Sequence, residues 1–277
     1  MKKLILASCT ADVYLYVDQI PSSSQDAKVM HKEMVLGGCG YHVAKACEEA
    51  ILFCPLGKGI YGDFVRQHLL NEDLECLLYP VKEDNGVCYC MIEENGQRTF
   101  LSDHGAEYHY AKEMFSDLPP TDWIYVSGID LEEKQNQCVI DYLNCVDANL
   151  FFSPGPRVTF IPEICEKMLK RRPVLHMNKE ECESWTRRSM EEGMKYLWDQ
   201  TQRPVVVTDS FRGSYAYDGE MVYVPSVPVC STNVTGAGDT HAGSCLDSLS
   251  QGLDLETMLK KANQKASEKI IKKEGIL

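Results

Sequence analysis

Short apolar runs alternate with helix-like segments along nearly the whole chain, and this alternation constrains the fold more than any other feature of the sequence. The runs are rich in Val, Ile, Leu and Phe and lie at residues 3–8, 51–56, 122–127, 149–153, 173–177 and 204–209. Such runs are typical of strands that are buried on both faces of a parallel sheet. Helical segments separate them, at residues 40–50, 62–73, 131–146 and 161–172. The pattern predicts an α/β domain whose mostly parallel central sheet carries helices on both faces.

Two stretches with alternating apolar residues interrupt this rhythm, at residues 12–35 and 86–103. The second contains ENGQ at 94–97, an Asn-Gly pair that favours a tight hairpin turn. Because an isolated hairpin is marginally stable in water, each apolar face needs a partner. We interpret the two insertions as a small secondary sheet that forms a flap over a site.

Composition excludes several classes of function. The 277 residues carry a formal net charge of −13, which disfavours a nucleic-acid partner because phosphates attract basic surfaces. No apolar run approaches the roughly 20 residues of a membrane span, and the apolar run at the N-terminus is too short for a secretory signal. The 13 cysteines lack C-x-x-C spacing. We therefore expect buried free thiols in a reducing cytoplasm, with a metal site as the alternative.

The segment GKGIYG at 57–62 matches the G-x-G-x-x-G pattern of dinucleotide-binding turns. Such a site also needs an acidic residue about 20 positions on, at the end of the next strand, to hold a ribose hydroxyl. The nearest candidates, Asp73 and Glu75, come before the apolar run CLLYP instead of after it. We therefore interpret the glycines as a strand-to-helix turn that serves backbone geometry.

The segment STNVTGAGDTHAG at 231–243 carries the strongest chemical signal. Gly236 and Gly238 allow the backbone to turn successive N–H groups toward one point, and a helix that ends near Gly252 follows. A helix N-terminus of this kind attracts an anion, yet Asp239 follows it at once. One interpretation is that Asp239 only caps the helix. The other is that it removes a proton while the N–H groups hold a phosphoryl group, the pairing that phosphoryl transfer needs.

This segment resembles the C-terminal motif D-T-x-G-A-G-D of the ribokinase-like (PfkB) carbohydrate kinases. LGGCGYHVAKA at 36–46 is similar to the G-G-x-x-x-N-x-A segment of that family, and RTFLSDHGA, WIYVSGIDL, FFSPGPR, HMNKEE and VVVTDSFRGSYAY follow in family order. The resemblance covers almost the whole chain. It implies that residues 1–277 form one ribokinase-like three-layer sandwich, and that the insertions at about 12–35 and 86–103 combine into a small β lid.

The resemblance implies an ATP-dependent kinase that phosphorylates a hydroxyl of a sugar or nucleoside. The residues that match the catalytic and acceptor-binding positions of the family are Asp239, Gly236, Ala237, Gly238, Asp12, Gly37, Gly38 and His42. Asp239 matches the catalytic base, and residues 236–238 match the anion hole for the transferring phosphate. Asp12 matches the acidic residue that binds sugar hydroxyls, and its two carboxylate oxygens suit a vicinal diol. The glycine pair lets the backbone approach the sugar closely.

The resemblance also implies ATP and Mg²⁺ as cofactors. The matching positions are Asn178, Glu181, Thr208, Ser210, Gly213 and Asn263. Asn178 and Glu181 form the N-x-x-E motif that organises Mg²⁺ and its waters near the phosphates, and a solvated acidic helix start is the alternative. The segment 208–213 matches the nucleotide-binding loop. Asn263, on a late helical segment, stands where the family lines the adenine pocket.

Four positions depart from the family pattern. His42 stands where many relatives have Asn, and a packed structural His is the alternative to a sugar contact there. Asn233 replaces the first Asp of the C-terminal motif, Ser153 stands where relatives often have Asp, and Ser210 replaces a Gly of the nucleotide loop. None of the four alters the GAGD sequence, so we retain the predicted activity.

Two alternative functions stay open at this point. One is a kinase of a vitamin-type alcohol such as a pyridine or pyrimidine methanol, although Asp12 and the glycine pair favour a polyol. The other is a non-catalytic sugar-binding homologue, which the four departures favour and the intact Asp239 opposes. The predicted partners are ATP and a small-molecule acceptor, without nucleic acid or membrane. The resemblance also implies a homodimer formed through the lid.

Overall fold

The computed structural model describes residues 1–229 and 235–274. A nine-stranded sheet lies at its centre, in the order β13-β12-β11-β10-β9-β8-β1-β4-β5. Its strands are β1 (Lys3–Leu6), β4 (Ala50–Lys58), β5 (Glu75–Asp84), β8 (Trp123–Ser127), β9 (Asn149–Ser153), β10 (Val174–Asn178), β11 (Val205–Thr208), β12 (Ser214–Tyr217) and β13 (Met221–Val224). Neighbouring strands pair in parallel except β11–β12 and β12–β13, which are antiparallel. The predicted mostly parallel central sheet is therefore confirmed.

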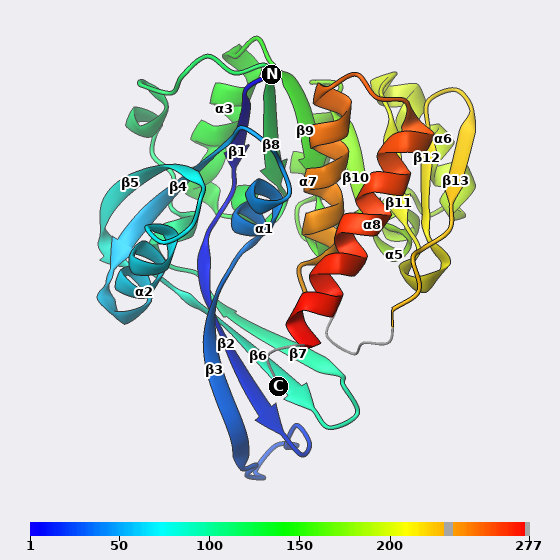
Figure 1. The fold of residues 1–277 in the computed structure, drawn as a ribbon. Helices are drawn as coiled ribbons and strands as arrows, with labels where there is room; N and C mark the ends of the chain where they lie inside the picture. Colours follow the sequence, from blue (N-terminus) through cyan, green and yellow to red (C-terminus); the bar gives the residue numbers. More distant parts are fainter. Residues whose placement is uncertain (230–234, 275–277) are drawn as a thin grey trace.

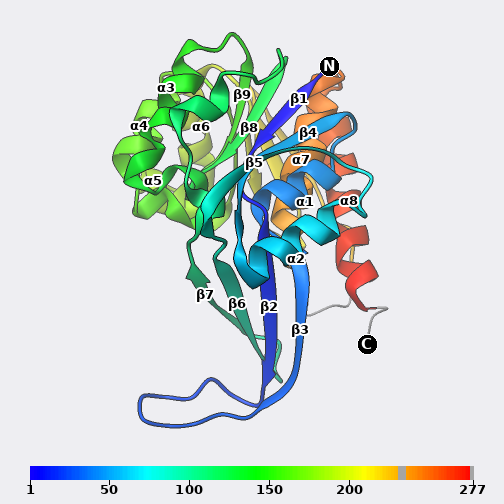
Figure 2. The ribbon, with the colours of Figure 1, turned by 90° about the vertical axis from the view of Figure 1, so that its left-hand side faces the viewer.

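Helices cover both faces of this sheet, as Figure 2 shows with the sheet seen nearly edge-on. One layer consists of α3 (Gln137–Cys145), α4 (Pro162–Leu169), α5 (Lys179–Thr186) and α6 (Met190–Thr201). The other consists of α1 (Cys39–Lys45), α2 (Gly59–Leu69), α7 (Ala237–Ser250) and α8 (Leu255–Glu274). Within the described ranges, no helix is both long and apolar enough to cross a lipid bilayer.

The strands are apolar on both faces because each face packs against one helical layer. Along β1, Leu4 and Leu6 belong to the core that includes residues of α3–α6, whereas Ile5 belongs to the core that includes residues of α1, α2, α7 and α8. All three side chains are fully buried. Successive side chains of a strand point to opposite faces. A strand between two layers therefore needs a continuous apolar run, which is the pattern seen in the sequence.

Both β insertions belong to a second, four-stranded sheet in the order β3-β2-β6-β7. Its strands are β2 (Thr10–Val17), β3 (Val29–Gly37), β6 (Val87–Glu93) and β7 (Arg98–Asp103). Parallel pairing of β2 with β6, from Ala11–Val87 to Val17–Glu93, joins the two hairpins. The Asn-Gly pair forms the β6–β7 turn, where Gly96 has a φ of +82°. Figure 1 shows this small sheet extending away from the main sheet on the side of the C-terminal end of α8.

The helix predicted over 131–146 is shorter in the structure, because α3 begins only at Gln137. Residues before it form 3₁₀ turns, Ile129–Leu131 and Lys134–Asn136. The buried Asn136 holds these turns, since its amide donates to the carbonyls of Tyr108 and Asp130 at 2.7 and 2.8 Å. A polar side chain that ties distant backbone segments is invisible to helical periodicity.

Helix α6 and the β12–β13 hairpin were not predicted, and α5 was indicated only by the acidic helix start considered for Asn178 and Glu181. Helix α5 buries few apolar side chains, so its sequence shows little helical periodicity. The β12–β13 hairpin forms the antiparallel edge of the sheet and has half-exposed positions. Helix α1 ends at Lys45, earlier than the predicted 50. The GKGIYG segment is the turn from β4 into α2, as the strand-to-helix interpretation predicted.

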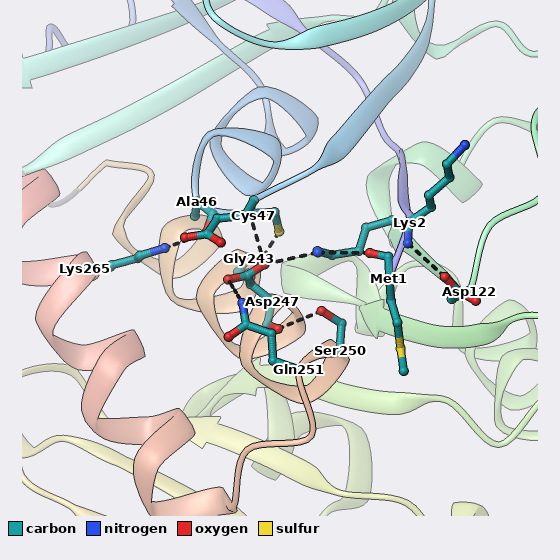
Figure 3. Close-up of polar contacts among 12 residues, drawn as sticks. Met1, Lys2, Ala46, Cys47, Asp122, Gly243, Asp247, Ser250, Gln251 and Lys265 are labelled. Atoms are coloured by element: carbon teal, nitrogen blue, oxygen red, sulfur yellow. Dashed lines mark hydrogen bonds and ion pairs between the residues drawn. The ribbon is translucent and has the colours of Figure 1, made fainter.

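A buried ion pair joins β1 to α7. Lys3 Nζ lies 3.2 Å from Asp247 Oδ1, and the two side chains are only 3% and 8% exposed. The same carboxylate accepts a hydrogen bond from the backbone N–H of Glu48, just after α1, at 3.1 Å. Figure 3 shows Asp247 near Cys47, whose thiol donates to a backbone carbonyl of α7 at 3.1 Å. Strand β1, the end of α1 and helix α7 therefore meet at one polar centre.

Replacement of Lys3 by Met tests this centre. It leaves the Asp247 carboxylate buried without its counter-charge, and such a loss costs about 3–5 kcal/mol. We expect the free energy of unfolding in urea to fall by this amount for Lys3→Met. The matched control is Lys2→Met, because Lys2 is exposed and its backbone N–H keeps its 2.8 Å bond to Asp122. Equal stability of the two variants would contradict the role of the ion pair.

Candidate active site

The predicted site residues gather at the carboxyl ends of the central strands. In a parallel sheet these ends meet at one edge, where ligands of α/β proteins bind. Asn178 ends β10 and pairs in register with Thr208, which ends β11. Ser153 ends β9 and pairs with Ser127 at the end of β8. The N-terminus of α7 lies at the same edge, because its last turns are held to the opposite end of the sheet near Lys3.

Helix α7 begins at Ala237, directly after a left-handed glycine. Gly236 is its N-cap in a left-handed conformation with a φ of +75°, and the first helical bond runs from the Thr240 N–H to the Gly236 carbonyl at 2.9 Å. The N–H groups of the first turn have no partner within the helix. Gly238 is exposed, and a methyl group built on it meets no described atom within 4 Å. The residues predicted as an anion hole therefore form a helix start that no described side chain fills at Gly238, and their role in holding a phosphoryl group stays a prediction.

Asp239 stands in the first turn of α7 and is half-buried. Burial raises the pKa of its carboxyl, while a hydrogen bond from the Cys39 thiol and the charge of Lys269 lower it. A carboxylate with a raised proton affinity is a better general base. Cys39 opens α1 directly after the glycine pair, and the sequence analysis did not single it out. Only the packing of α1 against α7 reveals that it contacts the predicted base.

His42 lies against Gly236, at the start of α7. A methyl group built on Gly236 would come within 2.7 Å of the His42 ring, so the ring packs directly against this glycine. Lys269 Nζ approaches His42 Nδ1 at 3.4 Å. The His42 side chain is buried. These contacts associate His42 with the support of the cradle, and its predicted contact with a sugar stays a prediction.

Asp12 lies on β2, where the small sheet meets the main domain, and is 7% exposed. Thr10 Oγ1 donates to Asp12 Oδ1 at 2.8 Å. A methyl group built on Gly37 would lie 2.2 Å from the Asp12 carboxylate. Gly38 has a φ of +91°, and a methyl group there would lie 2.6 Å from the Ser8 carbonyl oxygen. Gly37 therefore leaves space for the Asp12 carboxylate, and Gly38 allows the start of α1 to approach the Ser8–Thr10 backbone closely.

Asn178 and Glu181 form a reciprocal cap at the start of α5. Asn178 Oδ1 accepts from the Glu181 N–H at 2.8 Å, and Glu181 Oε2 accepts from the Asn178 N–H at 2.9 Å. Burial raises the pKa of the Glu181 carboxyl, and the charges of Asp239 and Glu180 raise it further. The N-x-x-E motif thus has a structural role of its own. The motif also places the Glu181 carboxylate close enough to Asp239 for their negative charges to interact. A cation bound between the two carboxylates would relieve this repulsion.

The nucleotide-loop residues of the sequence prediction form the 3₁₀ turn Ser210–Arg212 after β11. Asp209 holds this turn through two bonds from the Arg212 guanidinium at 2.7 and 2.9 Å. Ser210 has a φ of +49°, a left-handed conformation that suits the glycine usual at this position in the family better than a serine. Gly213 is required, because a methyl group there would lie 2.2 Å from the Val224 carbonyl oxygen.

Asn263 is buried in α8, and its amide is fully engaged within the protein. Its Oδ1 accepts from Ser214 Oγ at 2.9 Å and from His241 Nε2 at 3.2 Å. Its Nδ2 donates to the carbonyls of Val224 and Pro225 at 3.2 and 3.1 Å. An amide has four such valences. Asn263 therefore ties α8 to the β12–β13 edge, and its predicted place in an adenine pocket rests on the resemblance alone.

Of the remaining departures, Asn233 lies outside the described residues, and Ser153 is half-buried at the end of β9.

The small sheet also supplies a contact that the sequence did not indicate. Arg98 Nη1, at the start of β7, donates to Thr235 Oγ1 at 3.0 Å. Thr235 directly precedes the α7 cap, so the small sheet contacts the anion cradle.

This geometry defines the class of protein: a three-layer α/β sandwich in which the first turn of α7, with Asp239, lies at the carboxyl ends of the central strands. The profile of the pfkB family carbohydrate kinases matches residues 2–277, and the chain belongs to this family. It is 27% identical over 278 residues to an uncharacterized sugar kinase of Escherichia coli K12, YegV, which covers 95% of this chain and 87% of that protein.

Solved structures agree with the fold. The ribokinase of Thermotoga maritima superposes with a TM-score of 0.84 at 17% identity, over 97% of this chain and 92% of its own. A nucleoside kinase of Burkholderia thailandensis, in complex with inosine, superposes with a TM-score of 0.78 at 14% identity, over 97% and 91% of the two chains. The ribokinase-like fold expected from the sequence is confirmed.

A further carboxylate, Asp130, lies at this edge at a position that no sequence motif marks. Asp130 is fully buried; its Oδ1 accepts from the Ser8 N–H at 2.8 Å and its Oδ2 from Ser127 Oγ at 2.5 Å. Burial raises its pKa to about 7, against the opposing effect of these hydrogen bonds. Asp130 follows β8 in the GIDL segment, and a lone Asp there carries no sequence signal.

The raised pKa of Asp130 predicts a pH-dependent stability. The folded state binds a proton more tightly than the unfolded state, so the contribution is complete at low pH and is lost as pH rises toward and through about 7. Between pH 5 and pH 8 we expect wild type to lose on the order of 2 kcal/mol relative to Asp130→Asn. Urea unfolding at both pH values measures this difference. Asp141→Asn, at an exposed position of α3, should track wild type; parallel pH profiles of wild type and Asp130→Asn would refute the assignment.

Proposed function

We propose that this protein is an ATP-dependent phosphotransferase that phosphorylates a hydroxyl of a sugar or nucleoside. The observation that carries the proposal is the position of Asp239 in the first turn of α7, beside an open helix N-terminus. Membership of the pfkB family and the likeness to ribokinase and nucleoside kinase folds support it. ATP is the expected donor, since the family is one of carbohydrate kinases.

In this mechanism the N–H groups of residues 236–238 hold the transferring phosphoryl group and neutralise the charge that develops on it. Asp12 accepts hydrogen bonds from acceptor hydroxyls and orients the reacting one. Asp239 takes the proton from that hydroxyl as its oxygen attacks phosphorus. The charge of Lys269 acts on Asp239, and it also favours the negative charge at the cradle.

The oxygen-rich edge of the sheet fits Mg²⁺. Glu181 is held by the capping box through one carboxylate oxygen, Oε2, and burial, together with the neighbouring negative charge of Asp239, raises the pKa of its carboxyl. Mg²⁺ prefers carboxylate and water oxygens and usually shares its shell with substrate phosphates. Bound there, it would supply charge neutralisation for the phosphates. Thr208, Ser210 and Gly213 are the proposed nucleotide contacts, with Asn178 and Asn263 shaping the same side.

We assign the small sheet, formed by the insertions at about 12–35 and 86–103, to a lid over the acceptor within one kinase domain. Asp12 belongs to this sheet, and Arg98 contacts Thr235 at the cradle. Closure would exclude water that otherwise accepts the phosphate. The lid also exposes the apolar side chains Val29, Met30, Phe100 and Leu101. We propose that the lid pairs with the lid of a second copy, which would cover part of this exposed apolar surface, to form a homodimer.

We also propose a reducing, cytoplasmic location. The twelve cysteines that the structure describes are all free thiols, and most are buried or half-buried. Free thiols of this kind persist where glutathione and thioredoxin keep them reduced.

Asp239→Asn tests the mechanism. The amide keeps the shape of the side chain and cannot accept the proton, so we expect kcat to fall by about 10² or more while ATP binding changes little. The acceptor must first be found by coupled ATP turnover against a panel of pentoses, hexoses, nucleosides and vitamin-type alcohols. Near wild-type kcat of Asp239→Asn on that acceptor would remove Asp239 from the mechanism.

Asp12→Ala provides the contrasting variant. It should raise the KM of the acceptor strongly and leave the KM of ATP nearly unchanged, because Asp12 is assigned to the acceptor alone. Loss of ATP affinity without loss of acceptor affinity would mean that Asp12 belongs to the nucleotide end of the site and not to the acceptor end. A chain that binds a sugar in calorimetry yet turns over no member of the panel would instead be a non-catalytic homologue.

The lid predicts a joint response in hydrogen exchange. Addition of the acceptor should slow amide exchange in β2–β3 and β6–β7 together, since the β2–β6 pairing joins the two hairpins into one sheet. Mass spectrometry of the exchanged protein measures both segments in one experiment. Protection confined to one hairpin, or unchanged in both, would mean that the sheet is not a closing unit.

A further inference from the structure

Two histidines and a cysteine meet inside the protein, beneath the anion cradle. His241 and Cys245 stand four residues apart on α7, so they share one face of that helix. His176 lies opposite them on β10 of the central sheet. The three residues are 3%, 0% and 5% exposed, in the order His241, Cys245, His176. They stand apart from the carboxylates of the proposed site and have no part in the phosphoryl-transfer mechanism.

The side-chain atoms of the three residues converge on one point. His176 Nε2 lies 2.9 Å from His241 Nδ1, and Cys245 Sγ lies 3.5 Å from the same nitrogen. All three atoms lie within 4.8 Å of one another. Zinc binds imidazole nitrogen at about 2.0–2.1 Å and thiolate sulfur at about 2.3 Å, which separates such ligand atoms by roughly 3.3–3.8 Å. The His176–His241 and Cys245–His241 distances lie within about 0.4 Å of this range, and the remaining separation, at most 4.8 Å, must shorten by up to about 1 Å to enclose an ion.

The hydrogen bonds around His241 determine which of its ring nitrogens is free to bind a metal. Its Nε2–H donates to Asn263 Oδ1 at 3.2 Å, and Ser214 Oγ donates to the same oxygen at 2.9 Å. Since Oδ1 can only accept, Nε2 carries the proton and Nδ1 points an unprotonated lone pair at His176 and Cys245. A ligating histidine whose other nitrogen donates to a fixed oxygen is the usual arrangement in metal sites.

The protonation states agree with this geometry. Burial lowers the pKa of His176 and of His241, the latter to about 4, so both rings are neutral, the form that binds metals. Burial raises the pKa of the Cys245 thiol, so the thiolate forms there only with a neighbouring positive charge. A buried histidine pair alone explains the 2.9 Å hydrogen bond, but it gives the adjacent thiol no role.

We propose that His176, His241 and Cys245 bind one Zn²⁺ ion through Nε2, Nδ1 and Sγ. Two imidazoles and a thiolate suit zinc and other d¹⁰ ions, and exclude Mg²⁺, which takes oxygen ligands. On binding, the Cys245 thiol loses its proton to solvent, and the His176 proton moves from Nε2 to Nδ1. One proton is released for each ion bound. The ion ties β10 to α7 and steadies the helix whose first turn holds the phosphoryl group.

Direct metal titration tests the proposal. The full chain, stripped with a chelator under reducing conditions, should bind one equivalent of Zn²⁺ in competition with a chromophoric indicator, undisturbed by excess Mg²⁺. In weak buffer the titration should release one proton per ion. Co²⁺ in place of Zn²⁺ should give a thiolate-to-cobalt charge-transfer absorption. Absence of this band and of stoichiometric Zn²⁺ binding in the wild-type chain overturns the proposal without recourse to any variant.

Variants assign the ligands. Cys245→Ser should abolish the cobalt band and weaken Zn²⁺ binding by about 10² or more, and Asn263→Ala, which frees His241 Nε2, should weaken it by about 10–100-fold. The matched control is Cys165→Ser, a fully buried cysteine of α4 in the other core, which should bind like wild type. Circular dichroism confirms that each variant is folded. Equal binding by Cys245→Ser and wild type, or equal loss in Cys165→Ser, refutes the site.

Discussion

The proposed active site depends on how helix α7 is held, and a buried ion pair far from the chemistry holds it. Lys3 comes from β1, a central strand that pairs with both β4 and β8. Its contact with Asp247 fixes the last turns of α7 at the amino ends of the strands. Because the helix is rigid, its first turn then lies at the carboxyl ends, where Gly236 and Asp239 stand. This polar contact at one end, together with the packing of α7 on α1 and α8, sets the position of the cradle at the other.

Negative charge accumulates at that edge, and the protein offsets it with a limited set of groups. Asp239, Glu181 and Asp130 all have pKa values raised by burial. The N–H groups of α7, the Cys39 thiol and the Lys269 ammonium oppose this effect near Asp239. Burying carboxylates together costs free energy. Binding of a proton or a cation lowers this cost. In the proposed kinase, the proton would come from the acceptor hydroxyl and the cation would arrive with the nucleotide.

The packing of small residues explains why the motifs have their spacing. Gly37 leaves space for the Asp12 carboxylate, and Gly236 leaves space for the His42 ring. Helix α1, which carries His42 and Cys39, therefore lies between the proposed acceptor end and the anion cradle and contacts both. The small sheet reaches the same cradle through Arg98 and Thr235. Helix α1 and the small sheet, which are far from α7 in the sequence, thus both contact the start of α7.

By itself the sequence determined the fold class, the approximate place of most strands, the two β insertions and the GAGD helix start, because each has a local signature of periodicity, turn chemistry or backbone freedom. It did not indicate α6, the β12–β13 edge or the late start of α3. Half-exposed positions hide the β12–β13 edge, and the bridging Asn136 sets the start of α3 without any helical periodicity. Only the tertiary structure brought Cys39 to Asp239, His42 to Gly236, and His176 to His241 and Cys245. These contacts join residues from different helices and strands, and no local pattern records them. Packing of α7 beside α1, on the same face of the sheet, decided them.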